Sequence, residues 1–219
     1  FCDPKYVDVP VDYLLSDERA AWTRDRIDMG KASQFNSWNG FTAEHKDTTY
    51  LCVVDRDGNA ISFINSIFKS FGSCIMAPES GVILHNRGFS FRLEADHPNR
   101  IEPGKRPMHT IIPGMAMKGG KTVMPFGVMG GHYQSTGHTS FLSNMFDFGM
   151  DPQQANEAPR HFCFDGELAL EPRISEDVAE DLRKRGHNVT RTPSPHGGCQ
   201  AIYIDDERGV LVGGSDPRK

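Results

Sequence analysis

Positive charge, long apolar runs and paired cysteines are all scarce in this sequence. Its 219 residues carry 24 Lys and Arg against 29 Asp and Glu, which gives a formal net charge of -5 at pH 7. Nucleic acids and anionic membrane surfaces are usually bound through basic clusters, so neither is predicted as a partner. No apolar stretch approaches the roughly 20 residues that a membrane-spanning helix needs. These shortages point away from nucleic-acid binding and membrane insertion.

The cysteines add a further exclusion. There are five, an odd number, widely spaced and without a CxxC pair. A disulfide framework or a zinc site normally needs closely spaced, recurrent pairs. The pattern therefore indicates reduced thiols in a cytoplasmic protein. Because the chain starts at Phe1 rather than at a methionine, we expect it to be part of a longer protein, and a secreted or periplasmic location stays open.

What the sequence does contain is material for a packed core. Hydrophobic residues make up 37% of it and 14 Phe are spread along it, a composition typical of folded domains. Two β-favouring runs, Thr48–Val54 and 60–67, flank a turn at 57–59 and predict a hairpin. We also expect strands at 81–84 and 123–128, a hairpin from 201–204 and 210–213, and helices at 17–27, 141–150 and 176–185. Strands and helices in separate groups predict α+β layers rather than alternating βαβ units.

A candidate nucleophile follows the least regular part of the chain. Residues 30–47 are rich in Ser, Asn, Gly and Thr and are typical of an exposed, cleavable linker. Asp47-Thr48-Thr49 comes at its end and opens the first predicted strand. A threonine hydroxyl is a weak nucleophile unless a base lies beside it, and an α-amino group, with a pKa of about 7.7–8.0, is such a base. Cleavage before Thr48 would supply that amine, although a Thr-Thr pair is otherwise ordinary β-branched packing.

A longer set of motifs resembles the γ-glutamyltransferase family. The run from Thr48 to Ser62 resembles the start of that family's small subunit, and further matches follow in the family's order to residue 218. The segment at 6–10 and the helix after it are similar to the end of the large subunit. The matching segments are Phe71-Gly72-Ser73, Glu79-Ser80-Gly81, Pro103-Gly104-Lys105-Arg106-Pro107, Gly130-Gly131, Ala158-Pro159-Arg160 and Ser215-Asp216-Pro217-Arg218.

The resemblance implies an N-terminal-nucleophile hydrolase with a four-layer αββα sandwich, two stacked and mainly antiparallel sheets between helical layers. Residues 1–47 correspond to the end of the large subunit plus the cleavable linker, and residues 48–219 to the small, catalytic subunit of the same domain. The implied precursor cuts itself between Asp47 and Thr48, needs no metal or cofactor and keeps the rest of the large subunit as a partner. A homodimer of processed heterodimers is left open. The implied roles are nucleophile for Thr48, positioning for Thr49 and Ser66, and oxyanion binding for Gly130 and Gly131.

Departures from the family pattern bear on the substrate. Ser90 stands where the γ-glutamyl enzymes have an acidic residue that holds the substrate's ammonium group, which needs an opposite charge when it is buried. His109 and Thr110 replace two serines that hold the α-carboxylate, and Phe68 replaces an asparagine. Arg87 is a new cation, and an arginine fork grips a carboxylate through two parallel hydrogen bonds. The predicted substrate-binding residues are Asn86, Arg87, Ser90, His109, Thr110 and His132.

These departures favour hydrolysis of a small carboxylated amide, as in the oxamate amidohydrolase-like subgroup of the family. Two enzymatic alternatives are a γ-glutamyltransferase or glutathione hydrolase with an altered pocket, and a cephalosporin-type acylase. A third is an inactive homologue with a binding role. Arg87 and His109 could equally serve the scaffold, and the spacing of His132 and His138 is not that of a metal site.

Overall fold

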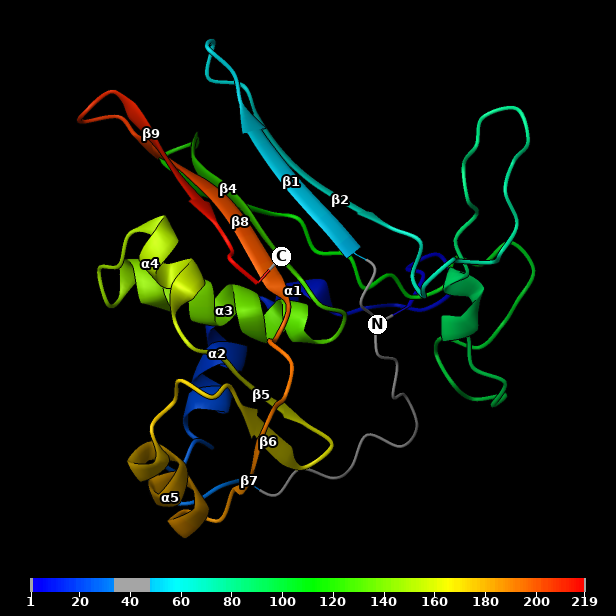
Figure 1. Ribbon diagram of the computed structural model, residues 1–219. Helices are drawn as coiled ribbons and strands as arrows, with labels where there is room; N and C mark the ends of the chain where they lie inside the picture. Colours follow the sequence, from blue (N-terminus) through cyan, green and yellow to red (C-terminus); the bar gives the residue numbers. More distant parts are fainter. Residues whose placement is uncertain (1, 34–47, 219) are drawn as a thin grey trace.

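The structure is a computed structural model that describes residues 2–33 and 48–218. Asp47 and the predicted linker from 34 onward lie outside the described residues. Figure 1 shows the elements in chain order. They are α1 (Val11–Leu14), α2 (Asp17–Arg24), β1 (Thr48–Val54), β2 (Ala60–Ser66), the 3-10 turn η1 (Arg87–Ser90), β3 (Gly114–Lys118), β4 (Lys121–Met129), α3 (Tyr133–Phe146), α4 (Pro152–Glu157), β5 (His161–Phe164), β6 (Glu167–Leu170), α5 (Glu176–Lys184), β7 (Asn188–Arg191), β8 (Gly198–Asp205) and β9 (Val210–Ser215).

Two antiparallel sheets are stacked on each other. β1 and β2 form a hairpin in which Thr48 is the register partner of Ser66. The second sheet has the strand order β3-β4-β8-β9 and all its pairs are antiparallel. Tyr50 and Ile64 from the hairpin pack with Met129 at the end of β4. The start of β1 and the end of β4 therefore lie at the same end of the stack (Figure 1).

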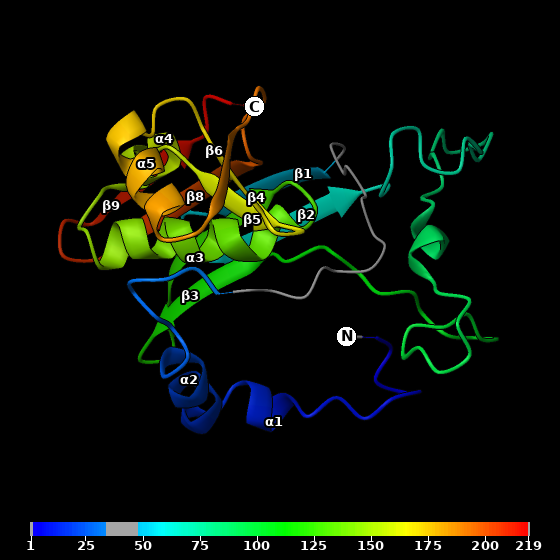
Figure 2. The ribbon, with the colours of Figure 1, turned by 90° about the horizontal axis from the view of Figure 1, so that it is seen from below.

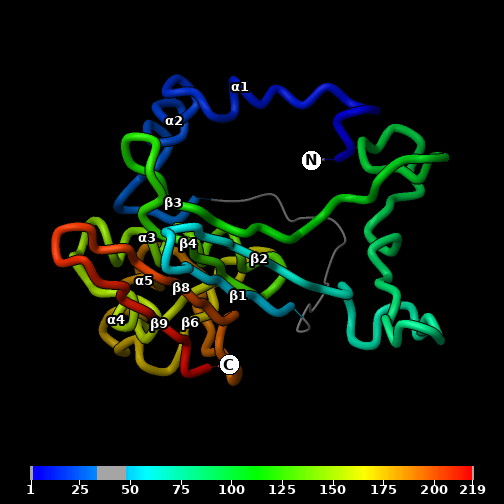
Figure 3. The backbone as a smooth tube through the Cα atoms, turned by 90° about the horizontal axis from the view of Figure 1, so that it is seen from above, coloured from blue at the N-terminus to red at the C-terminus, as the bar shows by residue number. Residues whose placement is uncertain are grey.

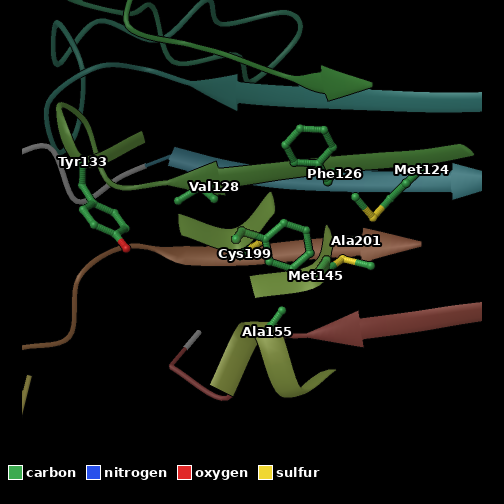
Figure 4. Packing of buried hydrophobic residues seen from close by; sticks show 9 residues of the cluster. Met124, Phe126, Val128, Tyr133, Met145, Ala155, Cys199 and Ala201 are labelled. Atoms are coloured by element: carbon green, nitrogen blue, oxygen red, sulfur yellow. The ribbon is translucent and has the colours of Figure 1, made fainter. Parts of the chain in front are cut away.

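Helices α3 and α4 cover the other face of the four-stranded sheet. The main core lies between these helices and the sheet. Figure 4 shows side chains of this core: Phe126 and Val128 come from β4, Cys199 and Ala201 from β8, and Met145 from α3. Val128, Cys199 and Ala201 are at most 2% exposed. Full burial of a side chain the size of Val128 stabilises the fold by about 1.5–3 kcal/mol. α4 begins with a capping box between Asp151 and Gln154, which gives hydrogen-bond partners to N–H groups at the helix start. The proline in its first turn has no N–H group that would need a partner.

A glycine lets the two sheets approach closely beside the start of β1. The ring of Tyr50 lies directly on Gly127, where a Cβ atom would overlap the ring carbons. The Tyr50 hydroxyl is 2.8 Å from Ser62 Oγ, and Ser62 Oγ lies 3.2 Å from the carbonyl oxygen of Phe126. A buried tyrosine usually finds such a polar partner. These contacts fix the hairpin on β4 and so fix the position of Thr48.

Gly127→Ala is expected to destabilise the protein by about 1–3 kcal/mol, because overpacking forces the Tyr50 ring away from β4. Chemical denaturation followed by circular dichroism measures the change. Gly213→Ala is the matched control, since Gly213 also lies in a strand but has open space around it. We expect the control to change stability by less than about 0.5 kcal/mol. Equal stabilities for the two variants would contradict the packing described here.

The third sheet has the strand order β5-β6-β7. It contains the only parallel pair among the named strands of the described residues. β6 pairs with β7 in parallel, and α5 connects them. This βαβ unit was not expected from the sequence, which indicated segregated strands and helices. A parallel pair requires a crossover connection, and α5 supplies it. Ser175 caps α5 by accepting a hydrogen bond from the Val178 N–H.

Several sequence predictions are confirmed and others need correction. The two predicted hairpins are present as β1–β2 and β8–β9, and the strand predicted at 123–128 lies within β4. The strand predicted at 81–84 is wrong, because this segment makes only an isolated bridge between Met76 and Ile83. The helix predicted at 141–150 begins earlier, at Tyr133, and the one predicted at 17–27 ends at Arg24. No helix in the described ranges is long and apolar enough to cross a membrane.

The segment between β2 and β3 extends to one side of the sheets, as Figure 3 shows. The N-terminal residues bind to its far part. Asp3 is buried and its carboxylate accepts hydrogen bonds from the Arg106 backbone and side chain, while the Tyr6 hydroxyl donates to the Pro103 carbonyl at 2.6 Å. The hydrogen bonds from Arg106 hold the pKa of Asp3 well below its usual value. α1 and α2, which follow, lie at the edge of the molecule (Figure 2).

Candidate active site

Thr48 is the first residue of β1, and its side chain is turned inward. It is 7% exposed, and its Oγ1 donates to Ser66 Oγ at 3.3 Å. The pairing follows from the hairpin register, which sets the two residues opposite each other. Ser66 Oγ also accepts a hydrogen bond from the Phe68 N–H at 3.1 Å. The two hydroxyls predicted from the sequence to work together are thus in contact.

Thr49 lies on the opposite face of the hairpin. Its side chain is exposed, and its register partner is Asn65. Successive side chains of a strand point to opposite faces, so Thr49 and Thr48 cannot share one face while β1 is regular. The positioning role predicted for Thr49 stays a prediction.

Gly130 and Gly131 link the end of β4 to the start of α3. Both have positive φ, 120° and 59°, a conformation that glycine adopts without steric cost. Their carbonyl oxygens accept the first N–H groups of α3, from Tyr133 at 3.1 Å and Gln134 at 3.2 Å. The glycines therefore stand at the positive end of a 14-residue helix. Backbone N–H groups at such a place are suited to binding an anion.

A second glycine loop packs against the first one. Gly197 has a φ of 58°, and a Cβ atom there would overlap the carbonyl oxygen of Met129. A Cβ on Gly130 would in turn lie 2.8 Å from Cα of Gly197. No motif in the sequence marks Gly197 as part of the site. Its contact with Met129 makes the loop at 196–198 a support for Gly130 and Gly131.

A buried ionic cluster holds this supporting loop. Glu171 accepts the His196 N–H at 3.0 Å, and Arg160 donates to the His196 carbonyl at 2.8 Å. Arg218 pairs with both Glu171 and Asp216. Burial raises the pKa of Glu171, but hydrogen bonds from Arg218 and from the His196 and Arg160 N–H groups outweigh it, and the pKa lies below its usual value. The sequence showed Arg160, Asp216 and Arg218 only as family motifs, without their spatial roles.

Arg87 places a buried cation beside Ser66, the register partner of Thr48. It opens η1 and is 2% exposed. Its Nη2 donates to the Ser66 carbonyl at 3.4 Å, and the guanidinium carbon lies 5.5 Å from the centre of the Phe68 ring. Nη1 is buried and has no hydrogen-bond partner within the described part of the chain. Burial lowers the pKa of Arg87. A buried donor of this kind is costly unless a ligand or water satisfies it.

Ser90 and Asn86, which flank Arg87 in the segment around η1, make hydrogen bonds to the backbone of the protein. Ser90 is buried, and its Oγ lies within hydrogen-bond distance of the Arg87 and Met108 carbonyls. Asn86 Oδ1 accepts the Lys69 N–H at 3.0 Å. Asn99 joins the segments that hold Ser90 and Met108, because its Nδ2 donates to the Ser90 carbonyl and its Oδ1 accepts the Met108 N–H. Their contacts are structural, and their predicted contacts with substrate stay predictions.

His109, Thr110 and His132 are placed differently from one another. His109 is exposed, with Nδ1 at 2.7 Å from the Pro107 carbonyl. The Thr110 carbonyl accepts a hydrogen bond from Gln134 Nε2, a contact that the sequence did not reveal. His132 stacks on Phe164 with ring centres 5.5 Å apart, and burial lowers its pKa. Thr110 is therefore tied to the start of α3, next to the glycines, and His132 to β5.

His138 links α3 to β4. His138 is buried on α3, and its Nε2 accepts the Val128 N–H at 3.0 Å, which ties the helix to β4. Burial lowers the pKa of His138 to about 4. No group of three or more His, Cys, Asp or Glu suited to a metal ion occurs in residues 2–33 and 48–218.

Comparison with solved structures defines the fold class. The chain superimposes on the crystal structure of cephalosporin acylase from Bacillus halodurans with a TM-score of 0.86 and 38% identity, covering 100% of this chain and 40% of that one. An acivicin-inhibited gamma-glutamyltranspeptidase matches with a TM-score of 0.71 and 30% identity over 78% of this chain and 98% of that one. The mixed α+β arrangement of antiparallel sheets is thus that of gamma-glutamyltranspeptidase-like proteins.

Sequence comparison names the family. The family model for gamma-glutamyltranspeptidase matches residues 1–219, and the chain belongs to this family. It is 36% identical over 229 residues to the glutathione hydrolase-like YwrD proenzyme of Bacillus subtilis, which covers 99% of this chain and 42% of the relative. It is 33% identical over 224 residues to the oxamate amidohydrolase proenzyme of Klebsiella pneumoniae, again 99% and 42%. The chain spans about two-fifths of the length of these relatives.

Proposed function

We propose that the chain is the nucleophile-bearing part of a self-processing amidohydrolase that cleaves a small carboxylated amide, of the oxamate type. Thr48 becomes the nucleophile after the precursor cuts the Asp47–Thr48 bond. The names of the relatives support a proenzyme, and one of them is an oxamate amidohydrolase. The geometry around Thr48 and Arg87 supports the substrate class.

The freed α-amine of Thr48 takes the proton from Oγ1, and Oγ1 attacks the carbonyl carbon of the amide. Negative charge develops on the carbonyl oxygen, where the N–H groups of the loop at Gly130 and Gly131 stabilise it. The C–N bond then breaks, and the leaving nitrogen takes the proton from the α-ammonium group. An ester on Oγ1 remains. Water hydrolyses this ester with the amine again acting as the base, which releases the acid and restores Thr48.

One observation carries the substrate assignment. Arg87 Nη1 is buried without a hydrogen-bond partner among the described residues, while its Nη2 contacts the backbone of Ser66. Since Ser66 contacts the nucleophile, an anion on Nη1 would lie close to the scissile amide. Ser90 provides no negative charge for a substrate ammonium group. These residues are therefore suited to a carboxylate near the amide and poorly suited to a γ-glutamyl group.

We infer that the missing part of the precursor completes the αββα sandwich. The outward face of the β1–β2 hairpin is apolar, and four of its side chains are 45–49% exposed: Leu51, Val53, Ile61 and Phe63. A sheet normally buries such a face against another layer. The chain covers 40% of the matched acylase, so a second helical layer from the rest of the large subunit is the proposed cover. We propose that the two subunits remain together after cleavage.

Gly197→Ala is expected to lower kcat by at least about tenfold with little change in KM. A Cβ atom there pushes on Met129 and displaces the loop that binds the oxyanion, and loss of one such donor typically costs about 10²–10³ in kcat. Steady-state kinetics on the processed enzyme measures the effect. Gly209→Ala is the control, because Gly209 has a similar φ of 64° but open space around it. Similar kcat values for the two variants would separate Gly197 from catalysis.

The substrate assignment is tested with a panel of amides on the processed full-length protein. The panel contains oxamate, a γ-glutamyl anilide and a glutaryl-type side-chain amide of a cephalosporin. We expect kcat/KM for oxamate to exceed that for the γ-glutamyl anilide by at least about 100-fold. The cephalosporin amide tests a second candidate, which the 38% identity to the Bacillus halodurans acylase favours. Comparable turnover of oxamate and the γ-glutamyl anilide would refute the proposal.

A further inference from the structure

The first described residues of the chain dock on a segment that is far away in the sequence. Asp3 is 4% exposed, and its Oδ2 accepts the Arg106 N–H at 2.9 Å. The Arg106 side chain donates to both carboxylate oxygens, at 3.4 Å to Oδ2 and 3.3 Å to Oδ1. The Lys5 N–H donates to Oδ1 at 3.1 Å. A buried carboxylate is costly without such partners, and hydrogen bonds to a charged group are stronger than neutral ones, so this contact fixes the two segments on each other.

The contact continues from Arg106 to η1, the turn that Arg87 opens. Two residues after Arg106, the Met108 N–H donates to Asn99 Oδ1 at 3.1 Å, and the Met108 carbonyl accepts from Ser90 Oγ at 3.2 Å. Asn99 Nδ2 donates to the Ser90 carbonyl at 2.7 Å, and Ser90 Oγ lies 2.9 Å from the Arg87 carbonyl. Arg87, Ser90 and Asn99 are all buried. Hydrogen bonds and a short stretch of backbone thus join the docked N-terminal segment to the backbone of Arg87.

The segment between β2 and β3 has little regular structure to hold it in place. All of its residues, 67–113, are described, and η1 is the only named helix or strand among them. Its strand-like pairing is limited to the isolated bridges Met76–Ile83 and Arg92–Arg100. Figure 3 shows the segment to one side of the sheets, where the start of the chain reaches it. A segment without a ladder of backbone hydrogen bonds opens locally at low cost, so its position depends on contacts such as that of Asp3.

We infer that the end of the large subunit, docked through Asp3, holds the segment that carries Arg87 in the position needed to bind the substrate carboxylate. The inference rests on the proposed function, in which cleavage of the Asp47–Thr48 bond puts Asp3 and Arg87 on different polypeptides. After the cut, noncovalent contacts of this kind keep the two polypeptides in place. Asp3 acts through Arg106 and not on the substrate itself, so it is a positioning residue.

The Asp3→Asn variant of the processed full-length protein is the main test. Asparagine keeps the shape but loses the charge, and it replaces one acceptor with an N–H group beside the donors of Arg106. A hydrogen bond to a charged group typically changes an equilibrium constant by about tenfold or more. Hydrogen exchange at residues 86–91, followed by mass spectrometry, should therefore become at least about tenfold faster. The Kd for oxalate, measured by calorimetry, and the KM for oxamate should rise at least about fivefold, with kcat changed by less than about twofold.

Three further variants separate positioning from general stability. Asp8→Asn is the matched control, because Asp8 lies in the same N-terminal segment but is exposed, and it should leave exchange, Kd and KM as in wild type. Asp3→Glu keeps the charge and should restore part of the binding. Arg106→Met serves if Asp3→Asn does not fold. The Arg106 side chain is 65% exposed, and its loss leaves the backbone hydrogen bond to Asp3, so the same changes should occur with smaller factors.

The inference is overturned if either the exchange at 86–91 or the Kd for oxalate is unchanged in folded Asp3→Asn protein. It is also overturned if the KM of an uncharged amide of similar size rises as much as that of oxamate, because the displaced group would then not be the Arg87 cation. If wild type neither binds oxalate nor hydrolyses oxamate, the proposed function fails, and hydrogen exchange alone decides whether Asp3 holds the segment.

Discussion

Replacing Thr48 with alanine is expected to abolish both cleavage of the Asp47–Thr48 bond and hydrolysis of the amide substrate. The alanine has no hydroxyl to attack either the peptide bond or the substrate, and it loses the hydrogen bond to Ser66 Oγ. Removing a catalytic nucleophile typically lowers kcat by about 10⁴–10⁶. Intact mass would show an uncut chain, and a release assay for ammonia would show no activity above background.

Thr48→Ser keeps a hydroxyl at the same position and is the matched control. It should still process and hydrolyse, at reduced rates, because serine lacks the methyl group that restricts χ1 of threonine. Circular dichroism should show that both variants are folded. Hydrolysis by an uncut Thr48→Ala protein at a rate near that of wild type would assign the chemistry to another residue.

Replacing Arg87 with methionine is expected to produce the second large loss. Methionine has a similar length and no charge, so the substrate carboxylate would be buried without its cation. Truncating one partner of a buried charge pair costs about 2–5 kcal/mol, or roughly 30- to 4,000-fold in kcat/KM. The loss should be found with carboxylated amides and be much smaller with an uncharged amide of similar size. Competitive inhibition by oxalate should weaken in parallel.

Two further arginine variants control for charge and for stability. Arg87→Lys keeps the charge but lacks the two-pronged geometry, so it should recover only part of the activity. Arg100→Met removes an exposed arginine that is paired with Glu102 and should behave as wild type. An equal loss on charged and uncharged amides in Arg87→Met would show that Arg87 supports the fold rather than the substrate.

Much of the β1–β2 hairpin could be predicted from the sequence because its signals are local. β-branched residues on both sides of Asp57-Gly58-Asn59 specify a hairpin, and the hairpin register then sets Thr48 opposite Ser66. Ser16 and Ser175, which cap α2 and α5, are of a residue type that favours the position before a helix. Two short hydrophobic runs, at 123–128 and 81–84, both predicted a strand, and only the first forms one. The first is buried in the sheet, and the second has three exposed side chains in Val82, Ile83 and Leu84.

The supporting parts of the site could not be predicted, because they join segments distant in sequence. Glu171 and Arg160 clamp the backbone of His196, and Gly197 then packs on the end of β4. Only tertiary folding brings these residues together. The sequence left the role of Arg87 open between substrate binding and the scaffold. In the structure its guanidinium makes one hydrogen bond to the backbone through Nη2, and no described residue satisfies the buried Nη1.

The central claim is that Thr48 acts as a new N-terminus. Intact mass and N-terminal sequencing of the full-length precursor, expressed and purified without added protease, test it most directly. The account predicts two polypeptides, the smaller one beginning Thr-Thr-Tyr-Leu-Cys. A single chain that remains uncut after long incubation would contradict the account and would favour an inactive homologue with a binding role.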